Sequence, residues 1–304
     1  MESQKPKIAM YVKRSFGEKL NASFDFIREN WKLMLKFTTY LLLPLCLIQA
    51  LSLNGMMKGM ESIVEGMDIS SDTALLISFL SYYGLFALLL IIGIVLQASL
   101  IYAMIRTYNE REERLQGITL KMLTPLLFHN IRRLFIIVLF GLLLTVCVSF
   151  ILGALSVMFF PITFLFALIA IVFAVPLALW APIYLFENIS IMEAFKKTFR
   201  LGFATWGGVF LISLVMGIIA GILQGVTLVP WYAATIVKIL FTMSDVTVSV
   251  GYSFMLYLLA IVQAFGTYLA MIFTFVGLAY QYGHASEKMD SVTIESDIDN
   301  FDKL

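Results

Sequence analysis

The sequence predicts an all-α membrane protein in which six transmembrane helices form three repeats, each an amphipathic interfacial helix followed by two spans. Three observations lead to this fold class. The chain is 61% hydrophobic and only 13% charged, whereas soluble domains carry about 25% charged residues. Its apolar residues come in runs long enough to cross a bilayer, for which about 20 residues suffice. Apart from Lys58 and Lys238, all Lys and Arg residues lie in four blocks, residues 1–36, 106–133, 187–204 and 284–304.

The spans are expected where apolar residues run without interruption. They cover about residues 36–53, 74–105, 134–157, 159–186, 207–229 and 247–282. The last run is longer than a straight crossing requires, so this helix must tilt, break or protrude from the bilayer.

The distribution of charge between the spans predicts how the chain is threaded. Residues 54–73 carry one cation, Lys58, against four acidic residues, whereas residues 106–133 are rich in Arg. Cations accumulate on the cytoplasmic side of a membrane protein. We therefore expect both termini in the cytoplasm and residues 54–73 outside. The expected location is the cytoplasmic (inner) membrane of a bacterium. The apolar segment 230–241 is expected to form a separate interfacial helix on the outer side.

Two capping boxes indicate internal duplication. Ser15 precedes Glu18 by three residues, as Ser190 precedes Glu193, and this spacing lets each side chain cap the other residue's backbone N–H. Each Ser is followed at the same offsets by an apolar stripe at helical spacing that ends on Trp. The side chains expected to anchor these two helices at the interface are Phe16, Leu20, Phe24 and Trp31, and Phe195, Phe199 and Trp206.

The middle block, with its stripe from Leu120 to Ile131 and with Pro125 inside it, is a poorer copy. The repeat units are therefore residues 15–105, 117–186 and 190–282, within a single bundle of residues 1–285. The acidic segment 286–304 is expected to be a disordered cytoplasmic tail. The interfacial helices either orient the spans, which we favour, or bind a partner or sense lipid.

Small residues recur every four positions in several spans and predict close helix packing. The positions are Gly141, Gly153, Ser213, Gly217, Gly221, Gly225, Gly266 and Ala270. Small side chains let helix backbones approach closely in a bilayer. The contact is expected within the chain's own bundle, with a homo-oligomer as the alternative.

The middle of the spans contains no Asp, Glu, Lys, Arg or His, which argues against a proton-coupled pump. Its polar groups include Gln97, Gln224 and Gln263, which either hydrogen-bond within the bundle or line a substrate path. No nucleophile elbow, phosphate-binding loop or zinc-protease motif occurs. Cys46 and Cys147 sit in apolar runs, away from any Cys/His cluster. We therefore expect no enzyme activity, no cofactor and no metal.

Residues 182–188 (PIYLFEN) and 191–201 (IMEAFKKTFRL) place an acidic residue at the end of one span, followed by a basic amphipathic helix that leads to an aromatic residue entering the next. This block resembles one found in uncharacterised bacterial six-span membrane proteins and in the membrane domain fused to some glycerophosphodiester phosphodiesterases. The resemblance implies the membrane architecture. It does not imply phosphodiester hydrolysis, which resides in a separate soluble domain of those fusions.

The function expected from the sequence is that of a non-enzymatic scaffold or accessory protein acting on lipid organisation or on partner assembly. The alternative is a transporter or exporter of a lipid or hydrophobic solute, because repeats often frame such paths. The expected partners are membrane lipids, with other membrane proteins or a second copy of the chain as further candidates. No nucleic-acid partner is expected.

Overall fold

A computed structural model describes residues 6–64, 73–158, 160–244 and 246–293 of the chain. Within these ranges the protein consists of eight helices, so the all-α class is confirmed. They are α1 (Phe16–Val64), α2 (Thr73–Glu110), α3 (Leu120–Met158), α4 (Phe160–Leu177), α5 (Trp180–Phe186), α6 (Ile191–Ala204), α7 (Trp206–Met243) and α8 (Val250–Met289).

Six stretches of these helices are long and apolar enough to cross a membrane, as predicted. Five lie in α1, α2, α3, α7 and α8, and the sixth covers Thr163–Phe186, which includes α5 and most of α4. Their most apolar stretches have mean hydropathies between 1.6 and 3.0. The protein is therefore a helical integral membrane protein with six candidate spans.

The boundary between interfacial helix and span differs from the expectation in two of three places. α1 and α3 each run without a break from the amphipathic stretch into the apolar one, because residues 31–36 and 131–136 contain no Gly or Pro to interrupt the backbone hydrogen bonds. Only α6 is separate from its span. Thr205 ends it with φ −129° and ψ 28°, and Gly207 and Gly208 lie in the first turn of the next helix. The separate interfacial helix expected over residues 230–241 is absent, because these residues continue α7.

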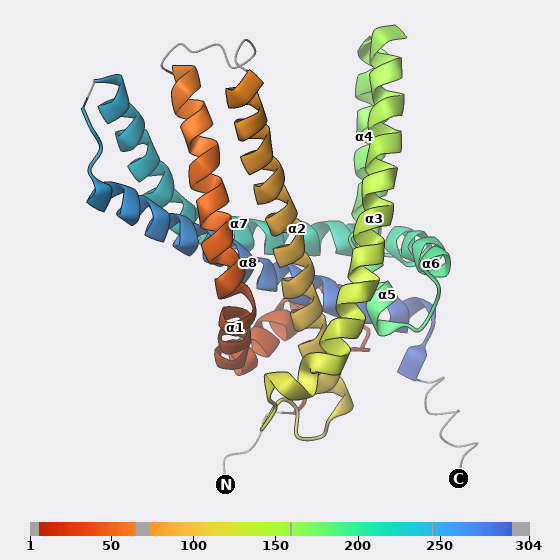
Figure 1. Ribbon diagram of the computed structural model, residues 1–304. Helices are drawn as coiled ribbons and strands as arrows, with labels where there is room; N and C mark the ends of the chain where they lie inside the picture. The colour runs from red at the N-terminus through yellow and green to blue at the C-terminus, as the bar shows by residue number, and fades with distance from the viewer. Residues whose placement is uncertain (1–5, 65–72, 159, 245, 294–304) are drawn as a thin grey trace. The chain divides into compact units, whose positions relative to one another are not determined.

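By contacts, the chain divides into two compact units. Among the described residues, the first contains those within 6–31, 99–217 and 273–293, and the second contains those within 32–98 and 218–272. The first unit includes all of α3 to α6. α3 packs against α4 and α5, and both α4 and α5 pack against α6. Figure 1 shows α3 and α4 as a long antiparallel pair.

The span expected over residues 159–186 is broken between α4 and α5, just after Pro176. Proline has no backbone N–H, so the carbonyl of Val172 loses its helical partner. The indole Nε1–H of Trp206 donates a 3.1 Å hydrogen bond to that carbonyl. The same proline lies directly under Gly202 of α6, where a Cβ would come within 2.6 Å of the Pro176 Cβ. Because Gly202 has no side chain, α6 can pack closely on Pro176 of α4. Because Pro176 has no N–H, the Val172 carbonyl of α4 is free to bond Trp206 of α7.

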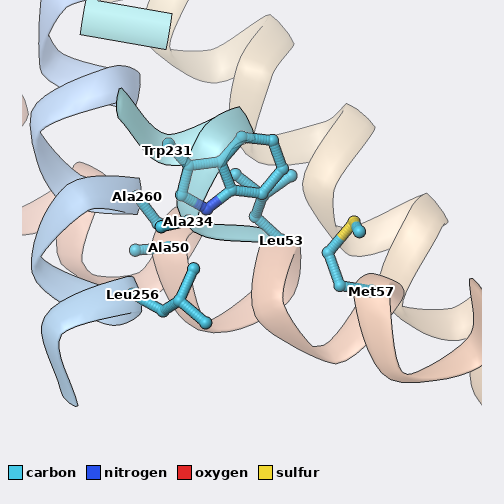
Figure 2. Close-up of a cluster of buried hydrophobic side chains, with 7 residues drawn as sticks. All are labelled: Ala50, Leu53, Met57, Trp231, Ala234, Leu256 and Ala260. Carbon is cyan, nitrogen blue, oxygen red and sulfur yellow. The ribbon is translucent and has the colours of Figure 1, made fainter. Parts of the chain in front are cut away.

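The second unit has its core around Trp231, which is only 4% exposed. Figure 2 shows its indole surrounded by side chains from α1, α7 and α8. The cluster comprises Ala50, Leu53, Met57, Trp231, Ala234, Leu256 and Ala260. A second cluster of the same unit contains Leu42, Cys46, Ala264 and Tyr268. Trp231 is therefore a core residue of this unit.

Candidate functional site

Charged side chains of the first unit meet around Glu187, the residue that ends α5. One carboxylate oxygen accepts a 2.8 Å hydrogen bond from the Tyr282 hydroxyl, and the other lies 2.8 Å from the Lys197 ammonium. Lys197 also pairs with Asp290 at 2.7 Å, and Asp290 in turn pairs with Arg200 at 2.7 Å. These five residues, which we call the Glu187 cluster, tie α5, α6 and the end of α8 together.

Arg133 attaches α3 to the region around Glu187. Its guanidinium lies 3.8 Å from the centre of the Tyr184 ring. Its Nη2 donates to the carbonyls of Glu187, at 3.1 Å, and Ile189, at 2.7 Å. Carbonyls at the end of a helix lack intrahelical donors. Arg133 supplies one and so couples α3 to the connection between α5 and α6.

The charge states in the cluster support each other. Burial disfavours the charged form of Lys197, but the hydrogen bonds to Asp290 and Glu187 outweigh it, so the pKa of Lys197 lies above its usual value. The cluster borders a surface hollow of about 410 Å³ that is also lined by Glu193 and Lys196. Since acids and bases in the cluster are paired with one another, its evident role is to hold helices together.

The capping box predicted at Ser190 is confirmed at the start of α6. The Ser190 backbone N–H donates to the Glu193 carboxylate at 2.9 Å, and the Glu193 N–H donates to the Ser190 hydroxyl at 3.3 Å. The first of these bonds holds the pKa of Glu193 below its usual value. The predicted box at Ser15 and Glu18 is also present, at 2.7 and 3.4 Å.

The N-terminal segment lies along the end of α2. The Lys7 ammonium donates to the carbonyls of Asn109, at 2.6 Å, and Arg111, at 3.2 Å. The backbone N–H of Met10 donates to the Asn109 side chain at 3.0 Å. These bonds cap α2 with an extended segment for which the sequence carries no local signal.

A second hollow of the first unit, of about 530 Å³, borders the N-terminal segment. Glu29 of α1 lies at its edge and receives hydrogen bonds from two directions, from the Tyr108 hydroxyl at 3.0 Å and from Arg114 at 2.8 Å. These contacts join the amphipathic stretch of α1 to the end of α2 and to the loop after it.

The glutamines proposed to line a substrate path occur as two separate groups in the second unit. Gln97 is buried and exchanges hydrogen bonds with the Thr38 hydroxyl at 3.2 and 3.3 Å. Gln224 and Gln263 instead both donate to the hydroxyl of Thr267, at 3.3 and 3.5 Å. Among the residues that the structure describes, the Gln263 side-chain oxygen has no hydrogen-bond partner.

The small residues proposed to pack helices have different surroundings. A Cβ at Gly266 would overlap the side chain of Thr227. Ala270 is buried, and the Ser213 hydroxyl is buried without a hydrogen-bond partner in the described part of the chain. A Cβ would meet no described atom within 4 Å at Gly141, Gly153, Gly217, Gly221 or Gly225. A packing role for these five glycines stays a prediction.

The proposed anchors of α1 lie beside its buried face. That face consists of Lys19, Ala22, Ser23, Phe26 and Asn30. The anchors Phe16 and Leu20 are half-buried, Phe24 is 37% exposed and Trp31 is 51% exposed.

In the second anchored helix, aromatic rings contact one another. Phe195 lies 5.1 Å from Trp180 and 5.6 Å from Phe140, between ring centres. Phe199 packs on Phe195 at 5.0 Å, and Trp206 stacks on Phe210 at 5.3 Å. Phe195 and Phe199 therefore join an aromatic cluster of the first unit, and Trp206 forms a separate pair with Phe210.

No protein-family model, curated protein or solved structure matches this chain. In the described residues, no three His, Cys, Asp or Glu side chains are grouped so that they could hold a metal ion.

Proposed function

We propose that this protein is a non-enzymatic membrane scaffold or accessory protein that acts on lipid organisation or on the assembly of a partner. The observation that carries the proposal is the bare surface of the α3–α4 pair. Only 6% of the most apolar stretch of α3 is buried, against 44% for α2 and for α8. Phe150 is 78% exposed and Phe164 is 68% exposed. In a bilayer such side chains contact either lipid tails or further helices.

The satisfied polar groups of the second unit support the same proposal. The Tyr268 hydroxyl donates a 2.7 Å hydrogen bond to the Gln49 side chain, and Gln97 is paired with Thr38. A polar group bonded inside a bundle is not free to bind a passing solute. We further propose that both termini face the cytoplasm of a bacterial cell. The distribution of cations supports this threading. We also propose a threefold repeat, which the duplicated capping boxes and the resemblance to the phosphodiesterase membrane domain support.

Site-specific photo-crosslinking tests the scaffold in native membranes. A photoreactive phenylalanine analogue replaces Phe150, and the buried Phe26 provides the matched control. For partner assembly we expect a discrete protein adduct at position 150 that is absent at position 26 and absent in vesicles of purified lipid. Lipid adducts alone would assign the surface to lipid organisation.

Transport is the second candidate. The buried side-chain oxygen of Gln263, which has no hydrogen-bond partner among the described residues, favours it. The test uses vesicles with a fluorescent phospholipid in both leaflets and a membrane-impermeant bleaching reagent. A scaffold should leave the inner leaflet protected, as in vesicles without protein. Bleaching of both leaflets that is lost on Gln263→Leu would refute the scaffold and establish movement of lipid.

A further inference from the structure

A third hollow of the first unit, of about 410 Å³, lies where the start of α1, the α6–α7 junction and the end of α8 meet. The ionisable residues that line it are all basic, whereas the Glu187 cluster contains both acids and bases. The hollow is lined by Lys19, residues 203–208, His284 and Lys288. Its size falls within the range of about 300–1,000 Å³ that is usual for ligand sites.

Lys19 is the unusual member of this hollow because only 4% of it is exposed. Its ammonium donates to the Gln281 side-chain oxygen at 2.7 Å, and Gln281 donates in turn to the Thr205 hydroxyl at 3.3 Å. Both partners are neutral. Among the described residues, neither Lys19 nor Lys288 takes part in an ion pair. Since buried charges are normally paired, this ammonium lacks the anion that its burial requires.

The ammonium also lies against the start of α7. A Cβ built on Gly208 would lie 3.0 Å from Lys19 Nζ, so the ammonium stands against the first turn of α7. The first turn of a helix presents backbone N–H groups without intrahelical acceptors and carries the positive end of the helix dipole. A buried cation at this end of a helix is repelled by it. An anion bound in the hollow that both of them border would be attracted by both.

Further donors border the same space. The Nδ1 of His284 accepts a 3.0 Å hydrogen bond from the backbone N–H of Arg14. A neutral imidazole that accepts at Nδ1 carries its hydrogen on Nε2 and is a donor there. Lys288 is exposed at the rim, and a Cβ at Gly207 would meet no described atom within 4 Å. The backbone of α7 is therefore open to a ligand at this point.

We propose that this hollow binds a phosphate group, held by Lys19, Lys288 and the backbone N–H groups at the start of α7. Phosphate accepts several hydrogen bonds at once, and helix N-termini bind it well. The aromatic side chains of Phe203, which is 43% exposed, and Trp206 lie at the same hollow and suit the apolar portion of a lipid. The phosphate is that of an anionic phospholipid or of a soluble phosphate ester. This inference does not rest on the scaffold function.

The test measures the thermal unfolding midpoint of the full chain in a neutral detergent. The probes are dioctanoyl phosphatidic acid, glycerol 3-phosphate and, as the zwitterionic reference, dioctanoyl phosphatidylcholine. We expect a saturable rise of the midpoint with phosphatidic acid, because a ligand that binds the folded state stabilises it. A rise with glycerol 3-phosphate as well would show that the phosphate alone suffices, and a rise with phosphatidic acid only would identify the lipid as its source.

Two variants and a control assign the response to the hollow. Lys288→Gln at the exposed rim should weaken binding about tenfold, the factor that corresponds to about 1.4 kcal/mol. Lys19→Met should abolish the response and raise the midpoint without ligand, because it removes an uncompensated buried charge. Lys121→Gln removes an exposed cation of α3 that does not line the hollow, so its response should equal that of the unchanged protein.

The opposite results would overturn the proposal. One is the absence of a saturable response to either phosphate probe. Another is an equal response in the Lys288→Gln and Lys121→Gln variants, which would show a general effect of charge. A third is a Lys19→Met variant that is less stable without ligand yet responds in full, since Lys19 would then only support Gln281. None of these results bears on the crosslinking at Phe150, so the two proposals fail separately.

Discussion

The contact between Gly202 and Pro176 offers the sharpest test of the packing in the first unit. Gly202→Ala adds one methyl group to α6. This Cβ would lie 2.6 Å from the Pro176 Cβ and 2.7 Å from its Cα. Carbon atoms pack best at about 3.5–4.0 Å, so the methyl group is about 1 Å too close. The obstacle is a ring and a backbone atom, and neither can rotate away.

Two opposing free energies decide the outcome. Overpacking a filled site costs about 1–3 kcal/mol. Replacing Gly by Ala inside a helix gains up to about 1 kcal/mol. The obstacle here is rigid, so the cost should lie in the upper half of its range. We expect Gly202→Ala to lower the free energy of unfolding by about 1–2 kcal/mol.

Gly141→Ala in α3 is the matched control. A Cβ at Gly141 meets no described atom within 4 Å, so only the helical gain of up to about 1 kcal/mol applies. Reversible unfolding of the full chain in mixed micelles, followed by circular dichroism, measures both variants. If Gly202→Ala stabilised the protein as much as Gly141→Ala, α6 would not rest on Pro176 and this account of the α4–α6 contact would be wrong.

Two hydrogen bonds lead to further testable predictions. Trp206→Phe should cost about 1–2 kcal/mol by leaving the Val172 carbonyl without a donor. In a Pro176→Ala background, the restored backbone N–H can bond that carbonyl, so the cost should nearly vanish; equal costs in both backgrounds would contradict the role given to the indole. In the second unit, Tyr268→Phe should lower the free energy of unfolding by about 1 kcal/mol, because the Gln49 side chain loses its donor. The same unfolding measurement tests this, and an unchanged value would show that the bond is unimportant.

Local patterns predicted local structure well. The capping boxes at Ser15 and Ser190 form because donor and acceptor belong to the same turn of backbone. The long apolar helices follow from hydropathy alone, since any backbone inside a bilayer must satisfy its own hydrogen bonds. The helix boundaries were predicted less well. Without a Gly or Pro to interrupt it, α1 continued from its amphipathic stretch into its span.

The candidate sites were largely beyond local reasoning. Lys19 lies outside the apolar stripe of its helix, and Lys288 belongs to the segment expected to be an acidic tail. The hollow that they share forms only because the start of α1 meets the end of α8. Similarly, Asp290 belongs to the segment expected to be disordered, yet it pairs with Lys197 and Arg200.

The sequence by itself determined that this chain is a helical membrane protein with six candidate spans, because the transfer of each side chain into lipid depends mainly on that side chain. Only the tertiary structure decided which charges are matched. Glu187 finds Lys197 and Tyr282, whereas Lys19 is left against the positive end of α7. The physical reason is that pairing energies depend on distance and burial, and both are set by helices that are remote in the chain.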